Sequence, residues 1–140
     1  MALTRAQREQ FLAEPHVAAL AVDAGEGRGP LTVPIWYQYA PGGDLWIMTG
    51  AGSRKEKLIR AAGRFSLLVD RVDPTIRYVS VEGPVLDTRP ATLEDLQEIS
   101  ARYLAEKVEG YVDFAWKNHG PQVVVRMRPE RWLTSDLGTV

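Results

Sequence analysis

The chain has 140 residues and a formal net charge of −1, which is long enough for one domain with its own hydrophobic core. Hydrophobic residues make up 45% and charged residues 25%, as in ordinary globular proteins, and the near-zero net charge gives no overall attraction for nucleic acid or an acidic membrane. Cysteine is absent, which excludes disulfides, thiol catalysis and zinc–thiolate sites. We expect a single domain over residues 1–140.

No apolar run approaches the roughly 20 residues that a membrane-spanning helix needs. The N-terminal residues also lack the apolar segment of a secretory signal. These features predict a cytoplasmic protein that binds neither membrane nor nucleic acid.

The N-terminal segment predicts a short helix followed by two strands. Thr4 and Gln7 have the spacing of a capping box, and Pro15 ends the helix. The β-branched and aromatic residues that follow predict strands over 16–23 and 31–39.

The second of these strands alternates between two faces. One face is expected to carry Leu31, Val33, Ile35, Tyr37 and Tyr39. Pro34, on the other face, cannot donate a ladder hydrogen bond and therefore marks an edge, a bulge or a gap that faces a ligand. Trp36 has two interpretations, contact with a ligand ring or packing in the protein, whereas Tyr37 is expected in the core.

The middle of the chain predicts a strand, a short helix and two further strands. A hairpin turn at 41–44 leads into the strand, and turn residues follow each later element. The expected ranges are 45–49 for the first strand, 53–62 for the helix, and 64–71 and 76–87 for the two strands. Gly83 and Pro84 interrupt the last of these and predict a bulge or bend.

The C-terminal third predicts helices followed by closing strands. Thr92 begins a capping pattern, and the helix that it opens is expected to run to about Val108 and to end at Gly110. A further helical turn is expected over 111–118. The closing strands are expected over 122–127 and 131–134.

Turn signals lie too close together for the long connections of a parallel sheet. The pattern therefore predicts a mainly β, α+β fold of six or more antiparallel strands with peripheral helices. A small closed barrel is the expected arrangement, because closure removes exposed strand edges.

The segment from Thr49 to Lys57 carries the strongest functional signal. It passes from a strand through two glycines to Ser53 and a helix, and it places Arg54 and Lys55 where the helix dipole favours anions. That arrangement predicts a seat for a phosphate or carboxylate. The alternative is a basic helix face, including Arg60, that simply contacts water.

The segment from Leu45 to Val69 resembles the flavin-binding split β-barrels of the pyridoxamine 5′-phosphate oxidase-like superfamily. There, a strand ending in Thr leads through a short turn into Ser-Arg-Lys, a helix and a strand of the type Arg-Val-Ser-Leu-Leu. The Pro-Ile-Trp segment ending at Trp36 and the Ser-Arg-Lys segment beginning at Ser53 are most similar to flavin/deazaflavin oxidoreductases of the B type, which use coenzyme F420. The resemblance covers most of the chain from Pro15 onward.

This resemblance implies a homodimer with cofactor sites between protomers, and hydride transfer between reduced F420 and a small unsaturated or planar acceptor. It places the phosphate on Arg54 and Lys55 and the ring along the strand that ends at Trp36, while Lys57 and Arg60 favour a long anionic tail. The implied cofactor-binding residues are Thr32, Val33, Pro34, Ile35, Trp36, Thr49, Ser53, Arg54, Lys55, Lys57 and Arg60. No catalytic side chain is identified.

Two alternatives remain open at this point. One is an FMN-dependent reductase or oxidase of the same superfamily, and the other is a non-catalytic flavin or haem carrier that uses His16. No metal site is expected, because His16 and His119 are the only histidines and lie far apart in sequence. The C-terminal segment does not align with the arginine-rich signature of true pyridoxamine phosphate oxidases, so vitamin B6 oxidation is not expected. The aromatic residues Tyr111, Phe114 and Trp116 predict a flap over the groove or ordinary packing.

Overall fold

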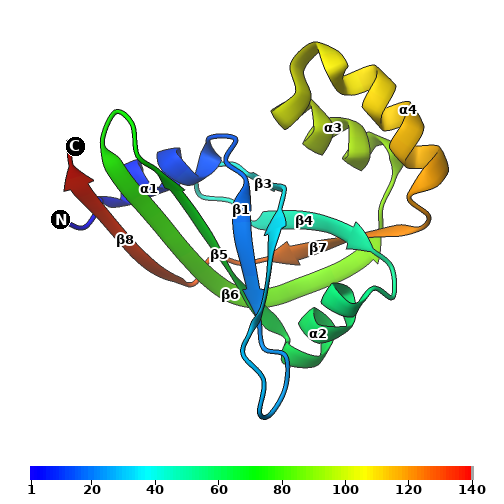
Figure 1. Ribbon diagram of the computed structural model, residues 1–140, viewed down its shortest axis with the longest axis horizontal. Coiled ribbons are helices and arrows are strands. Elements are labelled where there is room, and N and C mark those ends of the chain that lie inside the picture. The colour runs from blue at the N-terminus through cyan, green and yellow to red at the C-terminus, as the bar shows by residue number, and fades with distance from the viewer. Residues whose placement is uncertain (140) are drawn as a thin grey trace.

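A computed structural model describes residues 1–139 as a curled antiparallel sheet with helices around it (Figure 1). The helices are α1 (Arg5–Ala13), α2 (Arg54–Ala62), α3 (Leu93–Leu104), the 3-10 helix η1 (Ala105–Lys107) and α4 (Val108–Asn118). The strands are β1 (Ala18–Val22), β2 (Leu31–Ile35), β3 (Tyr37–Tyr39), β4 (Leu45–Gly50), β5 (Arg64–Arg71), β6 (Ile76–Pro90), β7 (Gln122–Met127) and β8 (Arg131–Gly138). Neighbouring strands follow the order β2-β1-β5-β6-β7-β4-β3, and β8 pairs with β6. No helix in this part of the chain is long and apolar enough to cross a membrane.

This architecture confirms the expected split β-barrel fold. The strands predicted over 64–71 and 122–127 have the observed bounds of β5 and β7. The helix predicted over 53–62 begins at Arg54, because Ser53 is its N-cap and accepts a hydrogen bond from the Glu56 amide. The closing strand predicted over 131–134 continues to Gly138.

Strand β6 turns the sheet into a half-barrel. Its first part pairs with β5 and β8, and its second part pairs with β7. The change of partner comes after the predicted interruption at Gly83 and Pro84, and the register shifts between Val85 and Asp87. The sequence therefore predicted an irregularity in this strand but placed it slightly too early: β6 runs through Gly83 and Pro84 without a break, and the shift comes between Val85 and Asp87. The strand also continues beyond its predicted end to Pro90.

The segment predicted as one strand over 31–39 is two strands separated by Trp36. β2 pairs with β1 and β3 pairs with β4, so the two pieces lie at opposite ends of the sheet order. Since no ladder joins β2 to β3 within residues 1–139, the expectation of a closed barrel is wrong. Pro34 lies on the edge strand β2, as predicted, and Ile35, Tyr37 and Tyr39 are buried.

The helix predicted to run from Thr92 to about Val108 ends at Leu104. The chain reverses at Ala105, the one non-glycine residue among those described with a positive φ (48°), and passes through η1 into α4. Gly110 lies inside α4, so its predicted role as a helix end is wrong. The reversal folds the two helices into a hairpin with a small core of its own, made of Leu96, Val112 and Ala115. This hairpin, the α3–α4 unit, lies at one side of the sheet (Figure 1).

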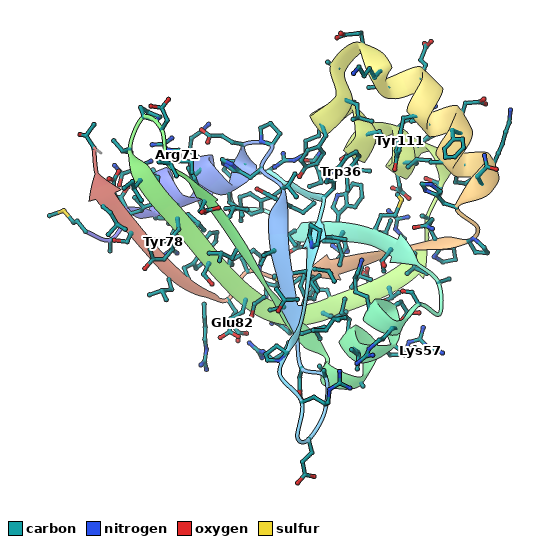
Figure 2. All side chains as sticks on the ribbon, in the orientation of Figure 1. Trp36, Lys57, Arg71, Tyr78, Glu82 and Tyr111 are labelled. Carbon is teal, nitrogen blue, oxygen red and sulfur yellow. The ribbon has the colours of Figure 1, made fainter. Side chains whose placement is uncertain are left out.

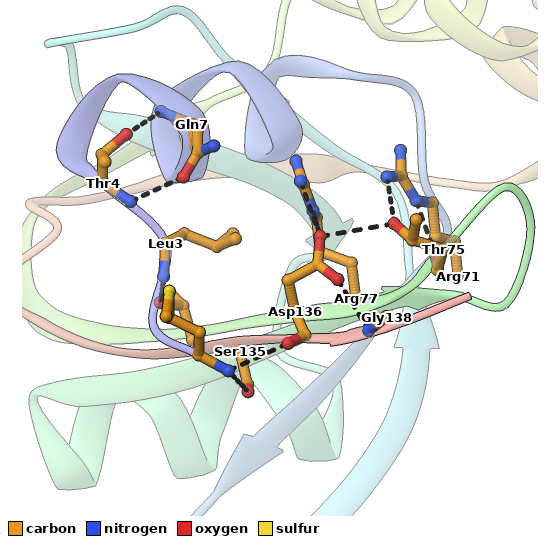
Figure 3. Close-up of polar contacts among 11 residues, drawn as sticks. Leu3, Thr4, Gln7, Arg71, Thr75, Arg77, Ser135, Asp136 and Gly138 are labelled. Carbon is orange, nitrogen blue, oxygen red and sulfur yellow. Dashed lines mark hydrogen bonds and ion pairs between the residues drawn. The ribbon is translucent and has the colours of Figure 1, made fainter. Parts of the chain in front are cut away.

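The N-terminal segment is joined to the last strand by hydrogen bonds (Figure 3). The Met1 amino group donates to the Asp136 carbonyl oxygen at 2.9 Å, and the Leu3 amide donates to Thr134 Oγ1 at 3.0 Å. The predicted capping box of Thr4 and Gln7 is present at the start of α1. Phe11 and Leu12 of this helix belong to the main core inside the half-barrel.

The junction between β6 and α3 depends on Asp95. Its carboxylate accepts hydrogen bonds from the Thr92 amide at 2.8 Å and from both terminal nitrogens of Arg89 at 2.6 and 2.9 Å. The hydrogen bond from Arg89 is the main reason that the pKa of Asp95 falls from 3.8 to about 2. Because the folded-state pKa lies below the unfolded one, this stabilisation is present above about pH 4 and is lost as the pH falls toward 2.

We therefore expect Asp95→Ala to lower the free energy of unfolding by about 1 kcal/mol near neutral pH, as for loss of a helix cap. Urea unfolding at about pH 7 and about pH 2.5 measures the effect, and the difference from the wild type should shrink at the lower pH. Asp113→Ala is the matched control, because its ion pair with Lys117 is exposed on both sides. If the difference in unfolding free energy between Asp95→Ala and the wild type were the same at both pH values, the ionised Asp95 carboxylate would not be the source of the stabilisation.

Candidate functional site

The β4–α2 bend (residues 49–57) forms the first half of the candidate site. Thr49 is buried near the end of β4, opposite Val123 of β7. The Ala51 amide donates to the Pro121 carbonyl at 3.0 Å, and the Ser53 amide donates to the Gly50 carbonyl at 3.1 Å. The bend is therefore held against the start of β7 by its own backbone.

The backbone amides of the bend divide into those with a protein partner and those without one. The Gly52 amide donates to Glu56 Oε1 at 3.2 Å, so Ala51, Gly52 and Ser53 all have protein partners. Within residues 1–139, no hydrogen bond is donated by the amides of Arg54 and Lys55, the first two residues of α2. An anion at this helix start would meet these two N–H groups and the positive end of the helix dipole.

The four cations predicted near the bend have different surroundings. Arg60 donates to Glu56 Oε1 at 2.6 Å, and Glu56 is buried. Arg60 therefore neutralises a buried carboxylate, which was not predicted from the sequence. Arg54 and Lys57 are exposed, and Figure 2 shows Lys57 on the outer side of α2. Neither forms an ion pair with another described residue.

Lys55 is the cation that stands out in this group. It is partly buried, and no acidic side chain pairs with it in the described part of the chain. Burial lowers the pKa of its ammonium group from the ordinary 10.5. A partly desolvated ammonium in the first turn of a helix whose first two amides are unpaired fits the phosphate of a nucleotide-like cofactor.

The predicted ring-binding strand is divided between surface and interior. Thr32 and Pro34 are exposed, Val33 and Trp36 are half-buried, and Ile35 is buried. Pro34, Ile35 and Trp36 line a cavity, whereas Thr32 and Val33 do not. None of the predicted basic residues lines this cavity.

The cavity has a volume of about 310 Å³ and lies between the β2–β3 junction, β4 and the α3–α4 unit. We call it the hairpin cavity. Its other lining residues, apart from the three named above, are Val17, Met48, Leu96, Ile99, Ser100, Tyr111, Ala115, Trp116, His119, Gly120 and Gln122. Most of these were not predicted as site residues, because α3 and α4 are remote in sequence from β2 and β4. Tyr111 and Trp116 had been singled out as a flap, and both line the cavity, but Phe114 does not.

Aromatic rings build one wall of the hairpin cavity. Trp36 stacks on Tyr103 with ring centroids 4.7 Å apart, and Tyr111 lies 5.8 Å from Trp36 (Figure 2). His119 makes an edge contact with Tyr111 at 6.2 Å. The cavity adjoins the β4–α2 bend through residues 120–122, because Gly120 and Gln122 line it while Pro121 accepts from the bend.

His16, the residue that a haem carrier would use, is engaged elsewhere. Its ring packs on Phe11 at 4.4 Å, and its Nε2 lies 3.2 Å from Glu14 Oε1. Across residues 1–139, no group of three or more His, Asp or Glu side chains is arranged to hold a metal ion.

The chain matches a known protein family over most of its length. The profile described as pyridoxamine 5′-phosphate oxidase matches residues 4–136. The chain belongs to this family. The family lies in a superfamily of flavin-binding oxidoreductases. No curated protein matches the chain.

Solved structures show the same fold. A conserved hypothetical protein from Mycobacterium tuberculosis is 26% identical, with a TM-score of 0.73 over 97% of this chain and 86% of the other. A protein titled F420 reductase is 22% identical, with a TM-score of 0.63 over 89% of this chain and 94% of the other. A FAD-binding protein from Mesorhizobium loti is also 22% identical, with a TM-score of 0.62 over 97% and 95%.

Proposed function

We propose that the protein is an oxidoreductase that uses coenzyme F420, with the cofactor phosphate at the start of α2. The observation that carries the proposal is Lys55, a partly buried cation without an acidic partner among the described residues, beside the unpaired amides of Arg54 and Lys55. The similarity to a protein titled F420 reductase adds support. Thr49 is buried near the end of β4 and Ser53 caps α2. The exposed cations Arg54 and Lys57 are proposed to contact the anionic tail.

When bound, a reduced deazaflavin supplies the hydride, so the chain needs no nucleophile of its own. The protein's part is to bind, orient and exclude water. Pro34, Ile35 and Trp36 present an apolar surface beside the hairpin cavity for this purpose. The segment from Thr32 to Trp36 is proposed to lie along the cofactor ring.

FMN is the second candidate cofactor, and one observation favours it. Arg60 was expected to bind the long anionic tail of F420, but it pairs with buried Glu56. The basic surface beyond the phosphate seat is therefore smaller than the sequence suggested. FMN needs the phosphate seat alone. Parallel titrations of tryptophan fluorescence with F420 and FMN decide between them, and tighter binding of FMN would replace the leading proposal.

A homodimer is part of this proposal. Leu68 of β5 and Leu133 of β8 flank Ser80 of β6 in register on one face of the sheet. Both leucines are exposed, at 44% and 65%. Two exposed leucines on one face of the sheet are suited to contact with a second copy of the chain. A monomeric mass in solution by light scattering would contradict this.

We expect Lys55→Met to weaken cofactor binding about tenfold or more, because a charge-assisted phosphate contact is lost. The thermal midpoint should stay the same or rise, since the variant no longer buries an unpaired charge. Lys107→Met, at an exposed lysine of η1, is the matched control and should change neither quantity. If Lys55→Met lowered the thermal midpoint as well as the cofactor affinity, Lys55 would be a structural residue.

The same lysine predicts a pH dependence of binding. Burial lowers the pKa of Lys55 in the free protein, and a bound phosphate would raise it again. Affinity should therefore fall as the pH rises from about 7 to about 10, through the lowered pKa. The cofactor affinity of the Lys55→Met variant should change less than that of the wild type between these two pH values. Titrations at each pH measure this change.

A further inference from the structure

Glu56 is the only acidic side chain that is buried among residues 1–139, and it lies in the first turn of α2. Its Oε1 accepts a hydrogen bond from the Gly52 amide at 3.2 Å, and its own amide donates to Ser53 Oγ at 3.3 Å. A carboxylate in this place complements the positive end of the helix dipole. It therefore occupies, from the buried side, the same end of α2 at which the cofactor phosphate is proposed to bind.

A buried negative charge in the first turn of α2 opposes a second anion there. The unpaired amides of Arg54 and Lys55 belong to the same helical turn, which rises only about 5 Å along the helix axis. At that range charges in a poorly solvated place interact strongly, and salt screens them little. Binding of an anion at this helix start therefore requires that the charge of Glu56 is neutralised.

Arg60 supplies that neutralisation from one helical turn later. Its Nη2 donates to Glu56 Oε1 at 2.6 Å, the same oxygen that accepts from Gly52. The side chain of Glu56 is 3% exposed, whereas that of Arg60 is 70% exposed. Glu56 forms no other ion pair within the described residues, so loss of Arg60 would leave a buried carboxylate without a counter-ion.

We propose that Arg60 controls binding of the cofactor phosphate through Glu56 and does not contact the phosphate itself. Arg60 is then a positioning residue, which holds and neutralises the Glu56 carboxylate so that Lys55 and the first two amides of α2 can act on the ligand. The inference rests on the proposed function, because it concerns the same phosphate. It differs from the role that the family resemblance implies for Arg60, which is direct binding of the cofactor.

A double-mutant cycle on Arg60 and Glu56 separates the two roles. Arg60→Met removes the counter-ion, and Glu56→Gln removes the buried charge while it keeps an oxygen that can accept from the Gly52 amide. F420 and FMN are each titrated by tryptophan fluorescence beside the same ring system without its phosphate, which is riboflavin for FMN and the ribityl deazaflavin for F420. Circular dichroism checks that each variant is folded at the temperature of the titration.

We expect Arg60→Met to weaken binding of the phosphate-bearing cofactor about tenfold or more near neutral pH, and to leave binding of the phosphate-free ring within about twofold. Adding Glu56→Gln should restore the cofactor affinity to within about threefold of the wild type, because no buried charge is then left at the helix start. Glu56→Gln alone should bind the cofactor at least as tightly as the wild type.

Arg5→Met is the matched control. Arg5 also pairs with a glutamate four residues away, Glu9, and its side chain is 78% exposed, but the pair lies on α1. This variant should leave the affinity for both kinds of ligand unchanged. Should Arg60→Met not fold, the double variant decides by itself, since it lacks Arg60 and contains no buried charge that needs a partner.

Three results would overturn the proposal. Binding by the double variant as weak as that of Arg60→Met would show that Arg60 contacts the phosphate directly. Equal weakening of the cofactor and the phosphate-free ring by Arg60→Met would make its role purely structural, and unchanged affinity would show that Glu56 needs no counter-ion. In each of these cases the wild type still binds its cofactor and the proposed function stands. Failure of the wild type to bind either F420 or FMN would instead contradict the proposed function, and this inference with it.

Discussion

Gly83→Ala is expected to prevent the chain from folding to its native structure. A Cβ atom built on Gly83 would lie 1.7 Å from the carbonyl oxygen of Arg128 and 2.8 Å from its carbonyl carbon. Real Cβ atoms never approach backbone this closely, and Arg128 cannot withdraw. Its amide donates to the Pro84 carbonyl at 3.1 Å, and two residues later the Glu130 amide donates to the Glu82 carbonyl at 2.9 Å.

The clash falls where β6 passes from one set of partners to the next, so relief would separate strands on both sides of the bend. We expect a loss of about 4 kcal/mol or more in the free energy of unfolding, which a marginally stable domain does not tolerate. Circular dichroism and thermal unfolding measure it. Gly29→Ala is the control, because no atom lies within 4 Å of a Cβ built there, and it should behave like the wild type. A folded Gly83→Ala protein of wild-type stability would contradict the close packing of the bend.

Arg102→Ala is expected to have the second largest effect. From α3, the guanidinium donates to the backbone carbonyls of Ala13 at 2.8 Å, Leu12 at 3.3 Å and Glu14 at 2.7 Å, and to Gln38 Oε1 at 3.0 Å. Three of these acceptors lie at the C-terminal end of α1, where a cation also complements the helix dipole. The variant would remove all four hydrogen bonds. It would leave the Ala13 carbonyl without a side-chain donor, whereas the Leu12 and Glu14 carbonyls still accept from the Tyr37 hydroxyl. We expect a loss of about 3 kcal/mol in the free energy of unfolding.

Arg102 also joins the α3–α4 unit to the half-barrel. Its neighbour Tyr103 does the same, because its hydroxyl donates to the His16 carbonyl at 2.8 Å and accepts from the Tyr37 amide at 3.2 Å. Arg102→Ala should therefore raise hydrogen exchange in α3 and α4 more than in the sheet. It should also disturb the hairpin cavity, since the walls of that cavity come from both the half-barrel and the α3–α4 unit.

Two variants control this prediction. Arg102→Lys keeps the charge but cannot reach acceptors on two elements at once, so its stability should be intermediate. Arg131→Ala, at an exposed arginine of β8, should change stability by no more than about 0.5 kcal/mol. If Arg102→Ala left both stability and hydrogen exchange unchanged, the contacts of Arg102 would not hold the hairpin in place.

The stability of the candidate site has a simple physical basis. The β4–α2 bend satisfies its own turn amides and pairs Arg60 with Glu56, so the bend does not need a ligand to fold. What it leaves unpaired is Lys55 and the first two amides of α2. Because these cationic and N–H groups are already in place before any ligand binds, the bend is preorganised for the anion that we propose.

The sequence by itself determined the local elements. Thr4 and Thr92 form the capping boxes that their spacing predicted, and β5 has its predicted bounds, because both depend on residues close together in the chain. The irregularity in β6 was predicted only approximately, because its register shift lies between Val85 and Asp87, just after Gly83 and Pro84. The phosphate seat at Ser53–Lys57 remains a proposal, but its strand–turn–helix setting was predictable.

Tertiary structure alone decided how these elements meet. The division of 31–39 at Trp36 arises because its two halves pair with strands at opposite ends of the sheet, a choice that no local pattern records. Arg60 donates to Glu56 because tertiary packing buries that glutamate one helical turn earlier, where it needs a partner. The hairpin cavity exists because Ala105 reverses the chain and folds α4 against α3 beside Trp36. Met48 and Ser100 line one cavity only through that packing, since they lie 52 positions apart in the sequence.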